Sequence, residues 1–279
     1  MSQAMMAQKQ LTLAKTAQAN PTHRFTNLYS LMHWDTWIRG AADAVLARPG
    51  SSTAGVDAMT RFHFKEHYKE HYEEQIQLIK DRLKGKTYQP QPVRRVHIPK
   101  GKGKTRPLGI ATLRDRIVQE ALRAILDPTY EADFQPHSYG FRKGRCTMDA
   151  IAVLMPLFNT SNKHYYVIEG DLKSYFDTVH HQKLLSLLKR RIADKDMLDL
   201  IWKFLKAGVM EDGLFARTET GLPQGAIISP LLSNVYLTEL DKWATERWDL
   251  SPAQRRQRRK AGLGNYRLVR FADDVRHIT

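Results

Sequence analysis

Two adjacent carboxylates, Asp273 and Asp274, directly follow residues 267–272 of this 279-residue chain. That segment combines Leu, Val and Phe with basic residues, a pattern typical of a β-strand. Aspartate is a poor strand former, so the pair is expected on a tight turn at the strand's end. There the two side chains can leave in different directions and hold a divalent metal. The alternative is a plain hairpin turn, because aspartate is a favoured turn residue.

A third carboxylate, Asp171, closes a second candidate strand over residues 165–172. If the two strands lie side by side in one sheet, Asp171 comes beside Asp273 and Asp274. Three like charges so close together are costly unless cations lie among them. Two Mg²⁺ ions held roughly 3.5–4 Å apart would relieve the repulsion and support an in-line displacement at phosphorus. Carboxylate oxygens are hard ligands that suit Mg²⁺.

Residues 93–110 predict a hairpin with a positively charged loop. The pattern indicates a strand over residues 93–99, a loop with three lysines over 100–105 and a returning strand over 106–110. A loop with glycines and lysines between arginines can wrap a triphosphate and neutralise its charge. A solvated hairpin without a ligand would show the same composition, because charged loops are common on protein surfaces.

Residues 138–145 combine basic side chains with interleaved aromatic ones. This combination suits contacts with a nucleic-acid backbone, and we assign Arg142 and Arg145 to that role, together with Arg94 of the predicted hairpin. A surface loop without function is the alternative. The basic run of residues 255–260 is expected to be a solvated loop ahead of the final strand, within reach of a phosphate backbone.

The overall charge points to a polyanionic partner. With 44 Lys and Arg against 29 Asp and Glu, the formal net charge is +15, which favours nucleic acid. An anionic membrane is the rival partner, but no apolar run approaches the roughly twenty residues of a membrane helix. No secretion signal is recognisable. The one cysteine, Cys146, excludes an internal disulfide, and we expect a cytoplasmic protein.

The other segments are predicted to be mainly helical. Residues 1–20 are polar and are expected to be weakly helical or disordered. Apolar spacing predicts helices over residues 21–47, 60–85, 115–126, from about 180, 198–207 and 227–243. Gly85 is expected to end the second of these helices and Pro128 the third. A short hairpin is expected around residues 211–213.

Six stretches resemble the motifs of group II intron-type reverse transcriptases, the bacterial retroelement class that includes intron maturases. They are TAGVD (53–57), IPKGKGKTRPLGI (98–110), SYGFRKGR (138–145), IEGDLKSYFD (168–177), GLPQGAIISPLLSNVYL (221–237) and RFADD (270–274). They occur in the order of the family, and the resemblance covers residues 20–274. One such motif is a weak signal, whereas six in order are highly specific.

The resemblance implies catalytic and metal-binding roles for the acidic residues. Asp171, Asp273 and Asp274 fall on the family's catalytic aspartates, which bind the metal, and Asp273 is expected to be the closer ligand of the pair. The Leu172 carbonyl is implied as a further metal ligand. The implied cofactor is a pair of Mg²⁺ ions, with Mn²⁺ as a substitute.

The resemblance also implies a set of residues that bind the nucleotide substrate. Phe176 falls on the aromatic residue that crowds the sugar 2′ position and rejects ribonucleotides. Gln224 falls on the nucleotide-binding glutamine, and Lys100 and Arg106 fall on the residues that hold the triphosphate.

The implied fold is α+β, the fingers and palm of a right-hand polymerase, with the palm an antiparallel sheet backed by helices. We expect an N-terminal helical extension over residues 1–56, fingers over 57–164 and palm over 165–279. The sequence ends five residues after the aspartate pair, so the thumb is expected to be absent and the palm to be truncated.

The implied activity is RNA-directed DNA synthesis, in which a primer 3′-hydroxyl attacks the α-phosphate of a deoxynucleoside triphosphate; loss of the thumb would impair it. The implied partners are an RNA template, a DNA primer, the triphosphate and an intron RNA, without a membrane. The alternatives are a non-catalytic RNA-binding maturase or splicing cofactor, and an inactive retroelement remnant. The sequence leaves the oligomeric state open.

Overall fold

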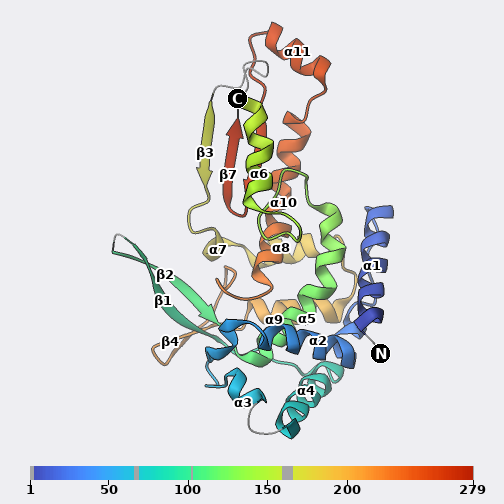
Figure 1. Ribbon diagram of the computed structural model, residues 1–279, viewed down its shortest axis with the longest axis vertical. Coiled ribbons are helices and arrows are strands. Elements are labelled where there is room, and N and C mark those ends of the chain that lie inside the picture. Colours follow the sequence, from blue (N-terminus) through green and yellow to red (C-terminus); the bar gives the residue numbers. More distant parts are fainter. Residues whose placement is uncertain (1–2, 66–68, 102, 159–165, 279) are drawn as a thin grey trace. The chain divides into compact units, whose positions relative to one another are not determined.

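The computed structural model describes residues 3–65, 69–101, 103–158 and 166–278 (Figure 1). The chain forms two compact units, each assembled from two stretches of sequence. Unit 1 comprises Met1–Ala132 and Phe176–Leu232, and unit 2 comprises Asp133–Tyr175 and Ser233–Thr279. Two of the three boundaries fall inside the helices α7 (Tyr175–Thr178) and α10 (Ser229–Trp248).

Unit 1 is mainly helical. Besides α7, its helices are α1 (Gln3–Ala19), η1 (Tyr29–His33), α2 (Asp35–Leu46), η2 (Pro49–Ser52), α3 (Arg61–Lys65), α4 (Lys69–Lys84), α5 (Leu113–Tyr130), α8 (His181–Leu188) and α9 (Lys195–Leu205), with η3 (Glu131–Asp133) at the unit boundary. The predicted apolar stripe of α5 is fully buried, and α5 packs against α1 and α2. It is therefore the central helix of this unit.

The predicted end of α5 at Pro128 is wrong, because the helix continues to Tyr130 with the proline inside it. Proline has no N–H group to donate to the carbonyl four residues earlier, which is that of Ala124. That carbonyl instead accepts a hydrogen bond of 2.8 Å from Nε2 of Gln10 in α1. A contact from a distant part of the chain thus replaces the helical bond that proline cannot make.

The N-terminal region also differs from the prediction. Residues 3–19 form a regular helix, with Leu13 and Ala17 buried, rather than a weakly ordered segment. The long helix expected over residues 21–47 begins only at Asp35. Before it, Phe25 forms a parallel bridge with Ile192, and this tertiary pairing takes the chain away from the helical conformation.

The helix α4 ends at Lys84, next to Gly85 as predicted, but Gly85 is not the left-handed residue of its C-terminus. The left-handed position is Lys86, with φ +59°, and its N–H donates to the carbonyl of Leu83. Gly85 immediately precedes Lys86. A Cβ added to Gly85 would lie 3.2 Å from the carbonyl oxygen of Asp81. The glycine therefore relieves crowding rather than supplying the left-handed residue.

A four-stranded sheet completes unit 1. Its strands are β1 (Val93–Gly101), β2 (Lys104–Ile110), β4 (Val209–Glu211) and β5 (Leu214–Ala216), in the order β2-β1-β4-β5. Both predicted hairpins are confirmed, since β1 pairs with β2 and β4 with β5 in antiparallel register. Parallel pairing of β1 with β4 joins the two hairpins.

Unit 2 is a three-stranded antiparallel sheet with helices against it (Figure 1). The strands are β3 (Val167–Asp171), β6 (Arg267–Phe271) and β7 (Asp274–Ile278), in the order β3-β7-β6, and the helices are α6 (Thr147–Leu154), η4 (Met155–Phe158), the main part of α10, and α11 (Pro252–Lys260). Two small apolar clusters cover the sheet: Leu268 and Val275 with Ala244 of α10, and Val269 with Tyr139 and Ala150.

The basic run of residues 255–260 is helical, which corrects the prediction of a loop. Ser251 caps α11 by accepting from the Gln254 N–H, and the Gln254 side chain accepts from the Ser251 N–H in return. Pro252 occupies the first turn, where its fixed φ favours a helix start. The sequence signal for this helix start is the capping box formed by Ser251 and Gln254, which lies ahead of the basic run.

Candidate active site

The acidic pair lies on the turn between β6 and β7, as the sequence predicted. Phe271 pairs with Asp274 across the hairpin, and Ala272 has a left-handed φ of +58°. The residue opposite Asp274 on the other side of β7 is Asp171, the last residue of β3. The sheet therefore brings the ends of both acid-bearing strands together.

The predicted arrangement of these strands needs one correction. The strand that ends in Asp171, β3, and the strand that precedes the aspartate pair, β6, are not neighbours, because β7 lies between them. Since directly opposed residues in an antiparallel pair project to the same face, Asp171 and Asp274 share one face of the sheet. Both are exposed, whereas Asp273 in the turn is half-buried.

The donor set of this turn fits a hard divalent cation. Its carboxylate oxygens are the ligands that Mg²⁺ prefers. The Leu172 carbonyl accepts a hydrogen bond of 3.1 Å from the Tyr175 N–H, and its second lone pair is a further oxygen donor. Among the described residues, no three His, Cys, Asp or Glu side chains converge closely enough to form a metal cluster.

The segment that begins the SYGFRKGR motif packs directly against the aspartate turn. Ser138 forms a parallel bridge with Arg270, and the Tyr139 N–H donates to the Arg270 carbonyl at 2.9 Å. A Cβ added to Gly140 would lie 2.2 Å from the backbone nitrogen of Ala272. Sequence reasoning assigned this motif to nucleic acid and missed its contact with the turn.

Two arginines of that motif have partners within their own loop. Arg142 is 8% exposed, and its Nη1 donates to the carbonyls of Gln135 and Ser138 at 2.8 and 2.7 Å. Arg145 lies over the Tyr139 ring and donates to the Pro136 and Ser138 carbonyls. Both arginines stabilise the loop, and their contact with nucleic acid stays a prediction.

In unit 1, two of the predicted nucleotide-binding residues contact each other. Nε of Arg106 in β2 donates to Oε1 of Gln224 at 2.8 Å, and the Gly109 N–H donates to the Gln224 carbonyl at 2.7 Å. Gly225 has φ +98°, and a Cβ there would meet Leu108 Cδ1 at 2.7 Å. The PQG turn is therefore seated on β2, and only glycine permits so close an approach.

The remaining basic residues of the hairpin differ in exposure. Lys100 at the end of β1 is exposed, as is Arg106, whereas Lys102 lies outside the described residues. Arg94 is half-buried, and its guanidinium donates to the Ala54 carbonyl at 3.1 and 2.7 Å. Arg94 thus fixes the TAGVD segment, and its predicted contact with nucleic acid is untested.

Phe176, the predicted sugar-side residue, is held by the GLPQG segment. The Leu222 N–H donates to the Phe176 carbonyl at 2.6 Å, and the ring is 8% exposed. Gly221 has φ +95°, and a Cβ there would meet the same carbonyl oxygen at 3.1 Å. Imidazole Nε2 of His181 contacts the Gly221 carbonyl at 2.7 Å, and burial lowers the pKa of this histidine.

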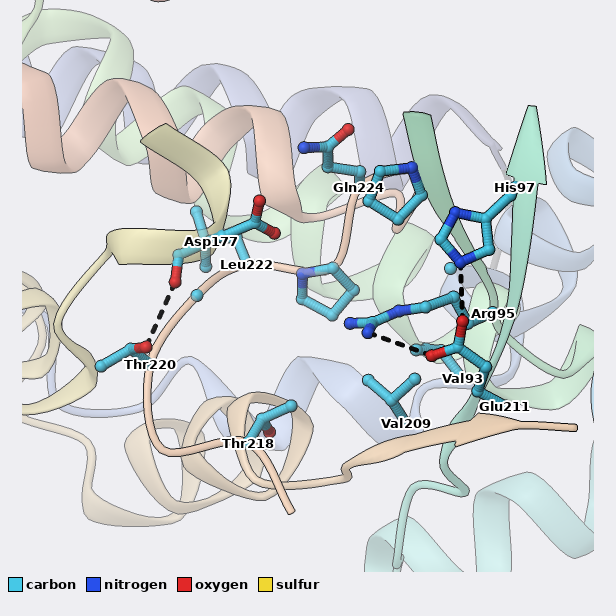
Figure 2. Close-up of a pocket in the computed structure, with 14 residues that line it drawn as sticks. Val93, Arg95, His97, Asp177, Val209, Glu211, Thr218, Thr220, Leu222 and Gln224 are labelled. Carbon is cyan, nitrogen blue, oxygen red and sulfur yellow. Dashed lines mark hydrogen bonds and ion pairs between the residues drawn. The ribbon is translucent and has the colours of Figure 1, made fainter. Parts of the chain in front are cut away.

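Unit 1 also contains a cavity of about 380 Å³ next to Gln224 (Figure 2). Its polar lining includes Arg95 and His97, which both contact Glu211, at 3.4 and 2.6 Å. The His97 hydrogen bond and the nearby Arg95 lower the pKa of Glu211. Strand alternation puts Arg95 and His97 on the face of the hairpin opposite to Arg106.

Comparison with known proteins identifies the class to which this fold and these motifs belong. Residues 98–278 match the family described as "Reverse transcriptase (RNA-dependent DNA polymerase)". The chain therefore belongs to the reverse transcriptase family. A solved chain from a "Partial Cas6-RT-Cas1--Cas2 complex" has a TM-score of 0.54 over 90% of this chain and 38% of its own, at 21% identity, which shows the shared fold alone.

The curated relatives specify the group II intron type. "Protein YkfC" of Escherichia coli K12 is 42% identical over 256 residues, which span 91% of this chain and 66% of the relative. "Group II intron-encoded protein LtrA" of Lactococcus lactis is 39% identical over 235 residues, 84% of this chain and 38% of the relative. The chain thus spans two-thirds or less of the length of these relatives.

In the part of the chain that the structure describes, no helix is long and apolar enough to cross a bilayer.

Proposed function

We propose that this chain catalyses RNA-directed DNA synthesis. The observation that carries the proposal is the register of unit 2, in which Asp171 lies opposite Asp274 at the turn that also bears Asp273. This turn lies within the region that matches the reverse transcriptase family. The substrates would be a deoxynucleoside triphosphate and a primer 3′-hydroxyl on an RNA template.

The residues of unit 2 would supply the metal-binding part of the chemistry. Asp171, Asp273 and Asp274 would hold two Mg²⁺ ions, with the Leu172 carbonyl as an additional oxygen ligand. When bound, such ions lower the pKa of the attacking hydroxyl and stabilise the charge of the leaving pyrophosphate. The protein's own contribution would be to bring the carboxylates to one end of the sheet, through the pairing of β7 with β3 and β6.

The residues of unit 1 would bind and select the nucleotide. Lys100 and Arg106 are exposed cations and would hold the triphosphate oxygens by charge-assisted hydrogen bonds. Gln224 would contact the nucleotide while its carbonyl stays bound to Gly109. The Phe176 ring would lie against the sugar, where it tolerates a hydrogen at the 2′ position but not a hydroxyl.

A second candidate function is RNA binding in intron splicing, without catalysis. It is favoured by the net charge of +15 and by the similarity to a group II intron-encoded protein. The partner in that case would be a structured intron RNA in the cytoplasm. Such a function would depend on basic side chains and would not need the aspartates.

Primer extension and RNA affinity of the Asp171→Ala variant separate the two candidates. We expect extension of an oligo(dT) primer on poly(rA) with Mg²⁺ to fall by on the order of a thousandfold, with RNA affinity within about threefold of the parent, because exposed carboxylates do not attract phosphates. Glu169→Ala is the matched control, since Glu169 is an exposed acid of the same strand.

Three other outcomes would contradict the polymerase proposal. Unchanged extension by Asp171→Ala would remove the aspartate from the chemistry. A parent chain that binds intron RNA and assists splicing, but extends no primer, would favour the second candidate. A parent chain that does neither would be an inactive remnant of the family.

A further inference from the structure

A buried arginine lies directly before the aspartate turn. Arg270, in β6, has a side chain that is 0% exposed, as does Asp241 of α10. Nε and Nη2 of Arg270 donate to the two carboxylate oxygens of Asp241 at 2.8 and 2.6 Å. Such a two-pronged pair is the strongest geometry available to a guanidinium and a carboxylate.

The remaining N–H groups of Arg270 connect this pair to three other residues of unit 2. Nη1 donates to Oδ1 of Asn234 at 3.1 Å and to the Ala272 carbonyl at 2.7 Å, and Nη2 donates to the Ser138 hydroxyl at 2.6 Å. A guanidinium has five N–H groups, so each has an acceptor. The Asn234 amide is itself oriented, because Nδ2 donates to the Gly140 carbonyl at 2.9 Å.

Stability alone is a weak reason for this arrangement. Removing two charges from water carries a large desolvation cost, and apolar residues of similar volume often give a fold that is equally or more stable. What an apolar pair cannot provide is a hydrogen bond to the Ala272 carbonyl. Ala272 has a φ of +58°, a strained conformation for a non-glycine residue that persists where its surroundings enforce it.

The hydrogen bond from Arg270 to the Ala272 carbonyl matters because of where Ala272 lies in the chain. Ala272 is the residue between β6 and Asp273, so its backbone conformation sets the direction in which the acidic pair leaves the strand. The Arg270 guanidinium holds the carbonyl side of this residue, and the close approach of Gly140 confines its nitrogen side. Two contacts from different segments thus fix the peptides on both sides of one residue.

We propose that Arg270, oriented by Asp241, is a positioning residue for nucleotidyl transfer: it holds the Ala272 carbonyl so that the carboxylates of the turn are preorganised to bind metal. This inference rests on the proposed function, since it assigns a catalytic purpose to the geometry of the turn. Arg270 itself does not touch the substrate. Its effect is on the turnover rate, because preorganised groups act in the transition state rather than in substrate binding.

The decisive test replaces the ion pair by apolar residues in the double variant Arg270→Met/Asp241→Leu. We expect it to melt within a few degrees of the parent but to lose about tenfold to a hundredfold in kcat for primer extension, as is typical of residues that orient metal ligands. The KM for the triphosphate should change by less than about twofold, because substrate contacts are intact.

A second readout needs neither metal nor substrate. Amide hydrogen exchange of the peptide that contains residues 270–275 should accelerate by about tenfold or more, because the turn opens locally when its carbonyl loses the guanidinium. The matched control is Arg267→Met/Asp249→Leu, which removes an exposed ion pair of 2.8 Å on the same strand. It should leave both kcat and the exchange of the turn unchanged.

Arg270→Lys decides the matter if the double variant does not fold. Lysine keeps the positive charge opposite Asp241 but lacks the planar fork that also reaches the Ala272 carbonyl. We expect its kcat to fall and its turn to exchange faster. Parental kcat and exchange in either variant would overturn the proposal. If the parent extends no primer, the proposed function fails, whereas the exchange experiment still tests the positioning role.

Discussion

The aspartate turn of unit 2 and the tip of the β1–β2 hairpin of unit 1 both carry charged residues assigned to nucleotidyl transfer, but they are built in opposite ways. The charge that fixes the turn, Arg270, is fully buried and hydrogen-bonded. The cations of the hairpin, Lys100 and Arg106, are exposed, and the hairpin turn passes through left-handed glycines. The aspartate turn is therefore shaped by the fold, whereas the exposed cations of the hairpin are free to adjust to a ligand.

This contrast has an energetic consequence. A buried ion pair permits one arrangement, since leaving either charge without its partner costs about 3–5 kcal/mol. An exposed lysine or arginine moves among rotamers and loses up to about 2 kcal/mol of side-chain entropy when a ligand orders it. Changes near the turn should therefore reduce turnover and stability, and changes in the hairpin should raise KM.

Among the changes that test this contrast, Gly140→Ala should have the largest effect, because it disrupts the packing of the turn. The added Cβ would lie 2.2 Å from the Ala272 nitrogen, and a backbone atom cannot move aside as a side chain can. We expect primer extension to fall by about a hundredfold, the usual result of a misplacement near 1 Å, with a melting midpoint lower by several degrees. Gly50→Ala, which has open space around it, is the control. Parental activity in Gly140→Ala would show that the turn tolerates displacement.

The next prediction tests whether Phe176, the residue proposed to contact the sugar, behaves like the rigid aspartate turn or like the adaptable β1–β2 hairpin. Phe176 is buried and its carbonyl is fixed by the Leu222 N–H, so its selectivity should depend on the ring itself. Phe176→Ala should reduce discrimination against ribonucleotides by about tenfold to a hundredfold, measured as the ratio of kcat/KM for dGTP and GTP. Phe176→Tyr, which retains the ring, should keep the discrimination. An unchanged ratio in Phe176→Ala would remove the sugar-side role.

A smaller effect is expected in the hairpin. Arg106→Ala should raise the KM for the triphosphate by about tenfold, with kcat within about twofold and no change in melting, because the side chain is exposed. Arg106 donates to Gln224. A double-mutant cycle with Gln224→Ala, measured on kcat/KM for the triphosphate, should therefore show a coupling energy of about 1 kcal/mol. A collapse of kcat at constant KM would place Arg106 with the rigid turn instead.

The smallest effect concerns the pH dependence of unit 2. His137 is 19% exposed and lies 3.9 Å from Asp241. Burial lowers its pKa below the ordinary 6.5, although Asp241 acts in the opposite direction. The fold thus favours the neutral imidazole, so its contribution to stability is complete above pH 6.5 and is lost as the pH falls below that value.

The measurement is the melting midpoint of the parent and of His137→Gln between about pH 7.5 and 5.5, the range in which an imidazole titrates. The parent should lose up to about 1 kcal/mol more than the variant as the pH falls. The lowered pKa of His181 is common to both chains and cancels in the difference. Equal losses of stability in the two chains would show that folding does not lower the pKa of His137.

Local pattern sufficed for much of this architecture. The Asp-Asp turn, the β1–β2 hairpin and the buried stripe of α5 follow from alternation, glycine placement and helical spacing, which are properties of short segments. The sequence indicated that Asp171 lies near the aspartate pair, but not which strand it pairs with. The strand after the turn, β7, takes the central place in the sheet, and its apolar content is too low to show this.

The features that the sequence did not reveal depend on contacts between distant residues. The helix α5 continues through Pro128 because Gln10 supplies the missing donor, and no window around the proline contains that information. The role of Arg270 is similar. An arginine that follows Leu268 and Val269 in a buried strand requires an equally buried acid as its partner. In the sequence, the indication of that partner is Asp241 within the mainly apolar helix α10.

The edge of the unit 2 sheet gives Asp171 a second consequence. β3 is an outer strand of that sheet, and its Val167 and Ile168 are about half exposed, a combination that invites pairing with strands of other molecules. The exposed charges of Glu169 and Asp171 oppose such association. The carboxylate proposed for metal binding thus also protects the chain from aggregation, so a catalytically silent variant at this position gives up some colloidal stability together with its chemistry.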